Sequence, residues 1–301
     1  MIKLNSARSI IVGLIVAPAL CALPPLSAQP KTITVLASNL VFPEGPTISK
    51  DGNTLFCVNV HAGFLTKVDL RTKTATREWV TLPNNGKGNG STLGPDGMLY
   101  IADVGAKSID RVDPITGAVS TYVNKDDTGA ALHGPNDLVF DTHGGLYFTD
   151  PDGSWGNPIG GVYYVTPKDH RVIKVAGGLM YPNGVVVSRD SKTLYIAMSV
   201  AKEVWAYSIP KGGFTGPTAG RLFAKVGVNG VPDGMRLGPD GFLYVAQMGD
   251  GVISKVDSAG HIVKQIVDPQ GTDNTNFCFS KDKKSLFVTE TKTNTLIQLP
   301  L

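Results

Sequence analysis

The chain has 301 residues and is nearly balanced in charge, with 28 Lys or Arg, 25 Asp or Glu and a formal net charge of +3. This balance leaves no basic footprint of the kind that binds nucleic acid or an anionic membrane, so we expect neither partner. A chain of this length can form one large domain or two small ones, and its 35 Gly and 20 Pro indicate many turns.

The first 28 residues have the pattern of a secretory signal peptide. Lys3 and Arg8 form a basic start, and the apolar core IIVGLIVAPALCAL and the small residues of LSA follow. Pro18 interrupts an apolar run that is already short for a membrane span, which disfavours an uncleaved anchor. The pattern therefore predicts an exported protein, periplasmic or secreted, with no membrane attachment after cleavage and with residues 29–301 as the mature domain.

After the signal, the segment TITVLAS at 32–38 has the pattern of a strand that belongs to no repeat. Six copies of one unit follow, and each contains a polar turn and then a Leu followed by an aromatic residue. The six leucines, spaced 43 to 49 residues apart, are Leu55, Leu99, Leu146, Leu194, Leu243 and Leu286. Alternating apolar residues and frequent turn signals indicate strands throughout, and no amphipathic helix is evident.

Four strands per repeat at a period in the forties is typical of a β-propeller blade. We therefore predict an all-β fold, a single six-bladed β-propeller with four antiparallel strands per blade. The sixth unit ends after its third strand, TLIQLP, so the strand at 32–38 is expected to complete that blade and close the ring. Cys57 and Cys278 lie within apolar strand patterns, which predicts free buried thiols, although export would permit a disulfide.

A polar side chain recurs at the entrance to the first strand of each unit, in FPEGP, YPNG, VPDG and related stretches. First strands of propeller blades line the central channel, so these side chains are expected to lie on one face around the axis. They are Glu44, Asn89, Asn136, Asn183, Asp233 and Thr275. Any single one could serve only its turn, because Asn and Asp beside Gly or Pro hydrogen-bond locally. Turn chemistry does not require Glu, however, and does not explain two carboxylates that converge without a partner.

A divalent cation would satisfy this arrangement. Glu44 and Asp233 would neutralise its charge, and the amide oxygens of Asn136 and Asn183 would complete the protein ligands. A set made only of oxygen favours Ca²⁺, with Mg²⁺, Mn²⁺ or Zn²⁺ as alternatives. Water or a substrate oxygen would fill the remaining positions, so that the ion could act as a Lewis acid. We expect Asn89 to support this site or to bind substrate beside it.

The second strand of each unit should end on the same face, four residues after the key leucine. Those end residues are Asn59, Asp103, Asp150, Met198, Gln247 and Glu290. For most of them we favour the interpretation of a solvated rim. Asp103, Asp150 and Asp137 could instead orient substrate or water beside a cation. His133 is a candidate acid or base, or else structural, and the Gly-rich loop 151–161 could cover a pocket or be a plain surface loop.

In this order, the stretches FPEGP, GPNDLVFD, GGLYFTDP, YPNG and PDGM resemble the senescence marker protein/gluconolactonase family of six-bladed propellers, over about residues 33–295. That family is similar in architecture to diisopropylfluorophosphatase and the paraoxonases. The resemblance implies a divalent ion held by Glu44, Asn183 and Asp233, with Asn136 as a fourth ligand or a substrate-binding residue. It also implies hydrolysis of a lactone or related ester, in which the ion polarises the carbonyl and Asp233 acts as general base or as nucleophile.

The substrate implied by the resemblance is a small lactone or ester. Animal members that handle sugar lactones have Arg two residues before the position of Asn136, whereas this chain has Gly134, which argues against a gluconolactone-type substrate. Hydrolysis of phosphoesters or organophosphates, and ligand binding without catalysis, stay open as alternatives. A metal-free condensing propeller similar to strictosidine synthase is disfavoured, because Glu44, Asn183 and Asp233 occur together. No G-x-S-x-G motif of a serine esterase is found, and the oligomeric state is left open.

Overall fold

All regular structure in this protein is β. The computed structural model describes residues 32–151 and 155–301, and the signal peptide predicted for residues 1–28 lies outside them. These two segments contain 24 strands and no helix, which confirms the predicted all-β class. Nothing in them therefore forms a helix long and apolar enough to cross a membrane.

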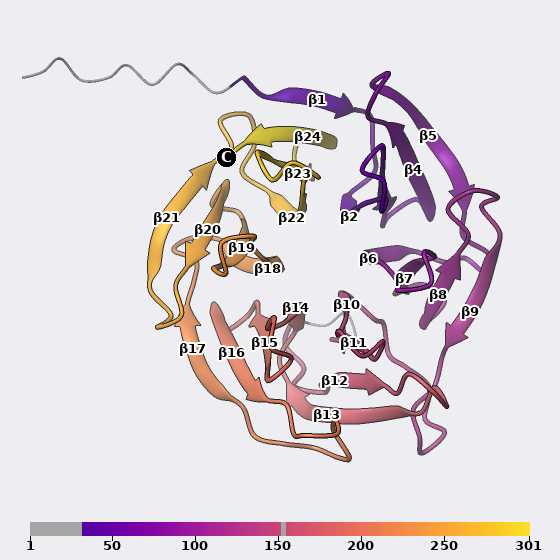
Figure 1. Cartoon of the computed structure of the whole chain (residues 1–301), viewed down its shortest axis with the longest axis vertical. Helices are drawn as coiled ribbons and strands as arrows, with labels where there is room; N and C mark the ends of the chain where they lie inside the picture. The colour runs from indigo at the N-terminus through magenta and orange to yellow at the C-terminus, as the bar shows by residue number, and fades with distance from the viewer. Residues whose placement is uncertain (1–31, 152–154) are drawn as a thin grey trace, which may run out of the picture. The chain divides into compact units, whose positions relative to one another are not determined.

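The strands form six antiparallel sheets of four strands each, arranged as blades around a central axis (Figure 1). Blades 1 and 2 contain β2 (Pro43–Ile48), β3 (Thr54–Asn59), β4 (Phe64–Asp69) and β5 (Thr74–Thr81), then β6 (Gly88–Leu93), β7 (Leu99–Asp103), β8 (Ser108–Val112) and β9 (Val119–Val123). Blades 3 and 4 contain β10 (Leu138–Phe140), β11 (Leu146–Asp150), β12 (Gly160–Val165) and β13 (Val172–Leu179), then β14 (Pro182–Val187), β15 (Thr193–Met198), β16 (Glu203–Ser208) and β17 (Arg221–Lys225). Blades 5 and 6 contain β18 (Val231–Leu237), β19 (Leu243–Met248), β20 (Val252–Val256) and β21 (Ile262–Val267), then β22 (Asn274–Phe279), β23 (Ser285–Glu290), β24 (Thr295–Pro300) and β1 (Thr34–Ala37).

Strand β1 closes the ring. It pairs antiparallel with β24 and forms the outermost strand of blade 6, so that sheet combines the first described strand with the last three. Because neighbouring blades pack only on each other, a strand shared between the two ends of the chain holds the ring shut. The predicted closure by residues 32–38 is confirmed.

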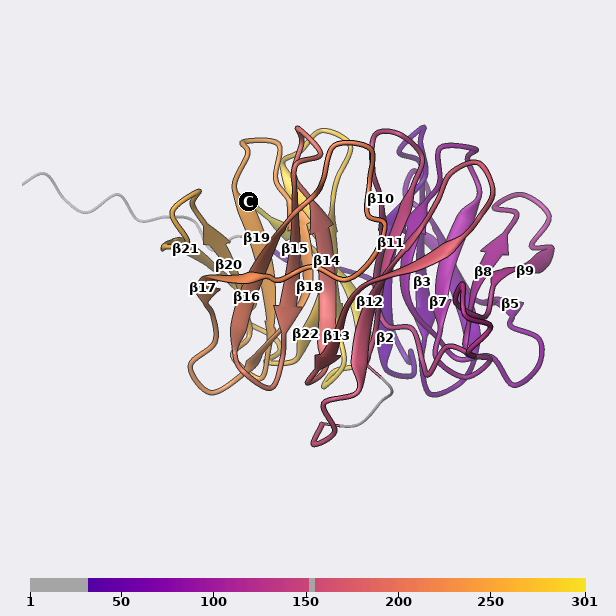
Figure 2. The ribbon, with the colours of Figure 1, turned by 90° about the horizontal axis from the view of Figure 1, so that it is seen from below.

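The first strand of every blade is innermost, and these strands run along the axis of the ring (Figure 2). The six key leucines lie at or near the start of the second strands and are at most 3% exposed. Each leucine packs between two blades, because successive side chains of a strand point to opposite faces of its sheet. The repeat in the sequence is therefore the repeat of the inter-blade contact.

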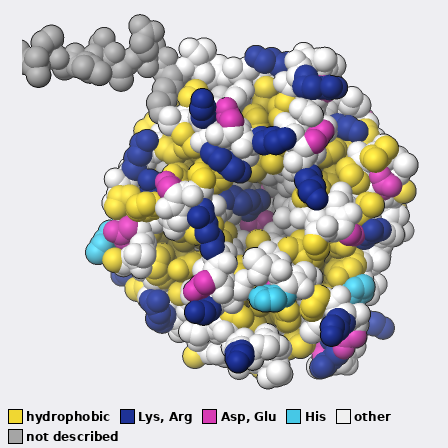
Figure 3. All heavy atoms as spheres, viewed as in Figure 1, with side chains coloured by type: hydrophobic (Ala, Val, Ile, Leu, Met, Phe, Trp, Pro, Cys, Tyr) yellow, Lys and Arg dark blue, Asp and Glu magenta, His cyan; other side chains and the backbone are white. Residues whose placement is uncertain are grey.

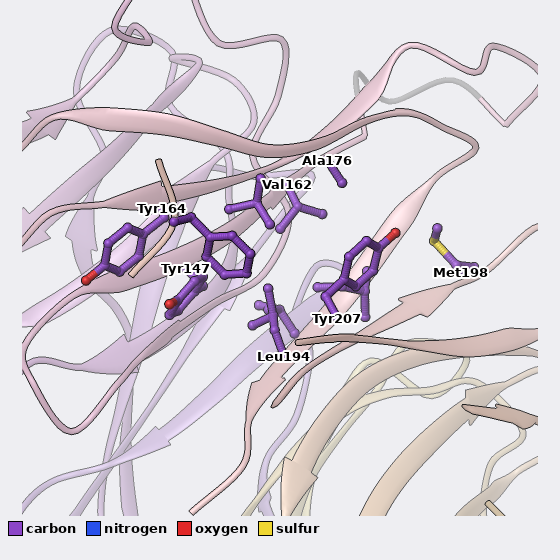
Figure 4. Packing of buried hydrophobic residues seen from close by; sticks show 11 residues of the cluster. Tyr147, Val162, Tyr164, Ala176, Leu194, Met198 and Tyr207 are labelled. Carbon is purple, nitrogen blue, oxygen red and sulfur yellow. The ribbon is translucent and has the colours of Figure 1, made fainter. Parts of the chain in front are cut away.

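The hydrophobic core is divided into six clusters, one at each interface between neighbouring blades. Figure 4 shows the cluster between blades 3 and 4, where Tyr147 and Tyr164 stack with ring centroids 4.6 Å apart beside Leu194. Divided cores of this kind leave the axis free for polar side chains, because apolar burial takes place between the blades rather than at the centre.

Cys57 and Cys278 pack in the cluster between blades 6 and 1, and both are free and buried. Burial raises the pKa of each thiol to about 12, which keeps it in the unreactive protonated form. The prediction of free buried thiols is confirmed.

Candidate metal centre and active site

The six polar residues at the strand entrances lie at one level of the channel. In five blades the residue just before each of them pairs with the end of the second strand, as Pro43 does with Asn59 and Pro232 with Gln247. In blade 3, Asn136 precedes β10 and its amide donates to Thr149 O at 2.9 Å. Equivalent register in every blade places the six side chains around the axis at the same mouth.

Irregular pairing between the first and second strands sets the direction of these side chains. In each of the same five blades the register shifts next to the polar residue, for example between Glu44 and Thr47. Such bulges turn side chains away from the regular pleat. Glycine follows in four blades, and a Cβ at Gly45 or Gly184 would lie 2.4 Å from Ser91 N or 2.3 Å from Asp233 O. The neighbouring first strands can approach this closely only because side chains are missing there.

Buried hydroxyl groups connect the blades at this level. Thr149 Oγ1 donates to Asn183 O at 2.7 Å, Ser199 Oγ to Pro232 O at 2.7 Å, and Thr275 Oγ1 to Pro43 O at 3.0 Å. Each bond runs from one blade to the strand entrance of the next. The backbone that carries the polar ring is thus fixed before any ligand binds.

Two carboxylates of the ring are almost completely buried. Glu44 and Asp233 are 3% and 6% exposed. Burial raises the pKa of Glu44 to about 7, and burial followed by the charge of Glu44 raises the pKa of Asp233 well above its usual range. Two buried acids that disfavour each other's ionisation fit a site for a cation, because a cation stabilises both charges.

The two carboxamides are also buried, each about 5% exposed. Asn183 Nδ2 donates to Ser199 Oγ at 3.2 Å, which leaves the amide oxygen for another partner. Within the described segments no group of three or more His, Cys, Asp or Glu side chains is arranged to hold a metal. A metal site at the ring would therefore depend on the amide oxygens of Asn136 and Asn183 as well as on the carboxylates.

Asp137 and Arg236 lie next to the ring and face each other across the channel. Arg236 Nη1 lies 3.4 Å from Asp137 Oδ2, whereas Asp137 Oδ1 is buried and has no hydrogen-bond partner among the residues described. Burial raises the pKa of Asp137, and the guanidinium of Arg236 opposes that rise. With Glu44 and Asp233 ionised as well, three carboxylates and one guanidinium carry a net charge that one divalent cation would balance. Figure 3 shows the opposite face of the propeller, where the other end of the channel forms a hollow with basic and acidic side chains at its bottom.

The ends of the second strands are not a solvated rim, so that interpretation is wrong. Five of the six end residues are at most 1% exposed and Met198 is 6% exposed. Asp150 accepts hydrogen bonds from the amides of His133 and Gly134, and Asp103 accepts from the amide of Lys87 at 2.7 Å. These side chains bind the loop that enters the first strand of their own blade. Both oxygens of Asp150 and one oxygen of Asp103 are therefore committed to backbone amides, which need a partner where they are buried.

The remaining predicted residues lie less deeply. Asn89 is partly exposed at its place in the ring. The side chain of His133 is 44% exposed and its Nδ1 lies 3.7 Å from Asp150 Oδ2, so its nearest recorded acidic neighbour lies outside the ring. The structure thus groups Asp137 with the ring. It places Asp103 and Asp150 at the ends of β7 and β11, and His133 in the loop that Asp150 binds.

Asp103 has a buried acidic neighbour, Asp110, which is 2% exposed. Burial, and after it the charge of Asp103, raise the pKa of Asp110 from 3.8 to about 6. Asp103 Oδ2 has no donor in the described part of the chain unless the Asp110 carboxyl is protonated. The geometry is therefore that of two carboxyl groups sharing one proton.

We expect Asp110→Asn to remove a pH-dependent part of the stability. A carboxyl whose pKa rises from 3.8 to about 6 on folding stabilises the fold fully below pH 3.8, and this contribution is lost as the pH rises through 6. The variant should therefore gain about 1–2 kcal/mol over the wild type between pH 4 and pH 7.5, after allowance for solvent screening. Urea denaturation across this range measures the difference, and parallel curves for the two proteins would contradict the shared proton.

Sequence reasoning missed Arg236, Ser199 and Asn276, which donates to Glu44. A signal for Arg236 exists in PDGMRL, because a basic residue three positions after Asp233 interrupts a strand that is otherwise apolar. Ser199 and Asn276 carry no such signal, since small polar residues are common at strand ends.

Buried carboxylates and carboxamides that converge at one mouth of the channel are typical of propellers that bind a ligand or catalyse a reaction there. Residues 42–292 match the family model described as SMP-30/Gluconolactonase/LRE-like region. The chain therefore belongs to this family, and the suspected resemblance is confirmed.

Two curated relatives and one solved structure illustrate the similarity. A gluconolactonase of Zymomonas mobilis is 31% identical over 281 residues, which cover 85% of this chain and 78% of that protein. Lactonase drp35 of Staphylococcus aureus is 31% identical over 231 residues, which cover 75% of this chain and 69% of that protein. The structure of a calcium-binding protein, regucalcin, from Agrobacterium tumefaciens has the same fold, with a TM-score of 0.75 at 20% identity over 89% of this chain and 93% of that one.

Proposed function

We propose that this protein is a metal-dependent hydrolase of lactones or related esters, with one divalent cation held by Glu44, Asn136, Asn183 and Asp233. The observation that carries the proposal is the pair of buried carboxylates, Glu44 and Asp233, at the mouth of the channel. Membership of the family and its relatives named gluconolactonase and lactonase support the reaction class. The oxygen-only donor set and the fold neighbour named as calcium-binding support Ca²⁺.

When bound, the ion would supply Lewis-acid polarisation of the substrate carbonyl. Asp233 would take a proton from a water molecule whose oxygen adds to the carbonyl carbon, and would return it to the ring oxygen as the C–O bond breaks. The product is an open hydroxy acid. Asn136 and Asn183 would orient the substrate or the ion from fixed backbone positions.

Hydrolysis of a panel of lactones with varied ring size, with and without a chelator, tests the proposal. We expect turnover that the chelator abolishes and that added Ca²⁺ restores. If the protein hydrolysed phosphoesters but no lactone, the proposed substrate class would change from lactones to phosphoesters. Tight binding of a lactone without any hydrolysis would favour a binding propeller instead.

Export is part of the proposal and rests on residues 1–28. Expression of the full chain in a Gram-negative host, followed by fractionation and N-terminal sequencing, tests it. Recovery of a periplasmic protein that begins near residue 29 would support export, and a cytoplasmic protein that keeps residue 1 would exclude it.

A further inference from the structure

Two aromatic residues occupy equivalent positions on opposite sides of the ring. Phe42 lies two residues before Glu44, and Tyr181 lies two residues before Asn183. Their strands, β2 and β14, face each other across the axis in Figure 1. Both residues are partly exposed. The repeat thus places two flat rings next to the candidate site, in blades 1 and 4.

Both residues adopt a backbone conformation that bulky side chains rarely enter. Their φ angles are 54° and 52°, in the left-handed region. The carbonyl of each accepts an equivalent hydrogen bond, Phe42 from Val60 N at 3.1 Å and Tyr181 from Ser199 N at 3.3 Å. Such conformations persist only where the surrounding structure holds them, and they are found at ligand sites more often than elsewhere.

A second aromatic ring extends each of the two. The ring centroids of Phe42 and His61 lie 4.5 Å apart at 35°, and those of Tyr181 and Trp155 lie 4.5 Å apart at 12°. Trp155 is 50% exposed although it stacks on Tyr181, so a large part of the indole is available to a ligand. Stacking on a fixed neighbour orients this indole in advance.

The surface around the Trp155–Tyr181 pair is also apolar. Ile159, in the loop that carries Trp155, is 43% exposed, and Met180, beside Tyr181, is 42% exposed. Exposed apolar side chains that adjoin in this way often mark a ligand site, whereas isolated ones need no explanation.

Several carboxylates at the ends of the second strands are engaged by the backbone of the loops on this face. Both carboxylate oxygens of Asp150 and of Glu290 accept hydrogen bonds from backbone amides, and so does one oxygen of Asp103. Gly134, two residues before Asn136, offers no side chain where blades 1 and 4 have Phe42 and Tyr181. A site that selects a sugar ring needs a partner for most of its hydroxyl groups, because a buried hydroxyl without one is costly.

From these contacts we infer that the substrate is a lactone with a flat, apolar substituent, and that Trp155 and Tyr181 select it by stacking. This inference rests on the proposed lactone hydrolysis. The ring residues act on the ester group, and the aromatic pair contacts the part of the substrate that does not react.

The test compares Trp155→Ala with the wild type on two δ-lactones of equal ring size, one benzo-fused and one the sugar lactone glucono-δ-lactone. We expect the wild type to prefer the benzo-fused substrate, and Trp155→Ala to lower its kcat/KM about tenfold through loss of stacking. Trp155→Phe should keep most of the activity, and the effect on glucono-δ-lactone should stay below about threefold. Val228→Ala is the matched control, because it also removes an exposed apolar side chain, but from the loop entering blade 5.

Binding of the corresponding lactams, which resist hydrolysis, tests substrate selection by the aromatic pair separately from lactone hydrolysis. Calorimetry on the protein in Ca²⁺ should detect tighter binding of the benzo-fused lactam, and weaker binding by Trp155→Ala. A preference for the sugar lactone, or an equal effect of Trp155→Ala on both ligands, would overturn the inference while leaving lactone hydrolysis intact. If no lactone of the wider panel is hydrolysed either, the proposed function fails, and lactam binding still decides whether the aromatic pair selects apolar rings.

Discussion

Asp233→Asn should lower kcat for lactone hydrolysis by about 10²–10⁴-fold or more, while the propeller stays folded. The amide has nearly the volume of the carboxylate but cannot accept a proton at neutral pH. Folding should survive because the bonds from Ser199 to Pro232 O and between neighbouring blades involve the backbone rather than this side chain. Steady-state kinetics in saturating Ca²⁺ measures the loss, and circular dichroism with thermal melting monitors the fold.

Asp110→Asn is the matched control for this variant, because it also neutralises a buried carboxyl, but in the outer part of blade 2. Its kcat should remain within about twofold of the wild type, since it contacts neither ring nor substrate. Equal losses in the two variants, or retention of a tenth of kcat by Asp233→Asn, would contradict the role of Asp233. A single turnover in ¹⁸O-labelled water then separates the two roles of this carboxylate. A general base leaves Asp233 unlabelled and puts ¹⁸O in the product, whereas a nucleophile first transfers its own ¹⁶O and becomes labelled.

The fold could be predicted from the sequence because each blade repeats one physical requirement. A leucine such as Leu55 or Leu146 must be buried between two sheets, and that need recurs at a nearly constant distance along the chain. Closure by β1 followed from counting strands, since a blade with only three would leave an unpaired edge. Alternation and spacing determine such features locally, without knowledge of the loops.

The site could be predicted only in its repeated part. Position within a repeat locates Glu44 and Asn183 at the channel mouth, but it does not show which hydrogen-bond donors the loops bring to a given acid. Asp150 and Asp137 are both candidate acids beside the ring, yet two amides of the loop that enters blade 3 bind the first, and the second keeps an unpaired oxygen. Arg236 of blade 5 pairs with Asp137 of blade 3. A local sequence pattern cannot predict a contact between residues so far apart in the chain.

Calcium should raise the thermal unfolding midpoint of the protein by several degrees at pH 7.5, and a chelator should lower it again. The proposed site forms only when four separate strand entrances meet, so binding of the ion would stabilise the folded state alone. A ligand present at about 1,000 times its Kd adds about 4 kcal/mol, which corresponds to about 8–16 °C for a domain of this size. Differential scanning calorimetry with and without Ca²⁺ measures the shift. The increment should shrink below pH 7, because protons compete for Glu44, whose pKa burial raises to about 7.

The effect of Glu44→Gln on the free energy of unfolding should change sign between protein in chelator and protein in Ca²⁺. In chelator the variant should be as stable as the wild type or more so, because the wild type buries a carboxyl that must stay protonated or pay for its buried charge. In Ca²⁺ it should be less stable, because it lacks half of the carboxylate charge that binds the ion. Glu290→Gln is the contrasting control: Glu290 is just as buried, but it accepts backbone amides, so this variant should lose stability equally in both conditions. If Glu44→Gln behaved like Glu290→Gln, Glu44 would be a structural residue and the ring would not hold a cation.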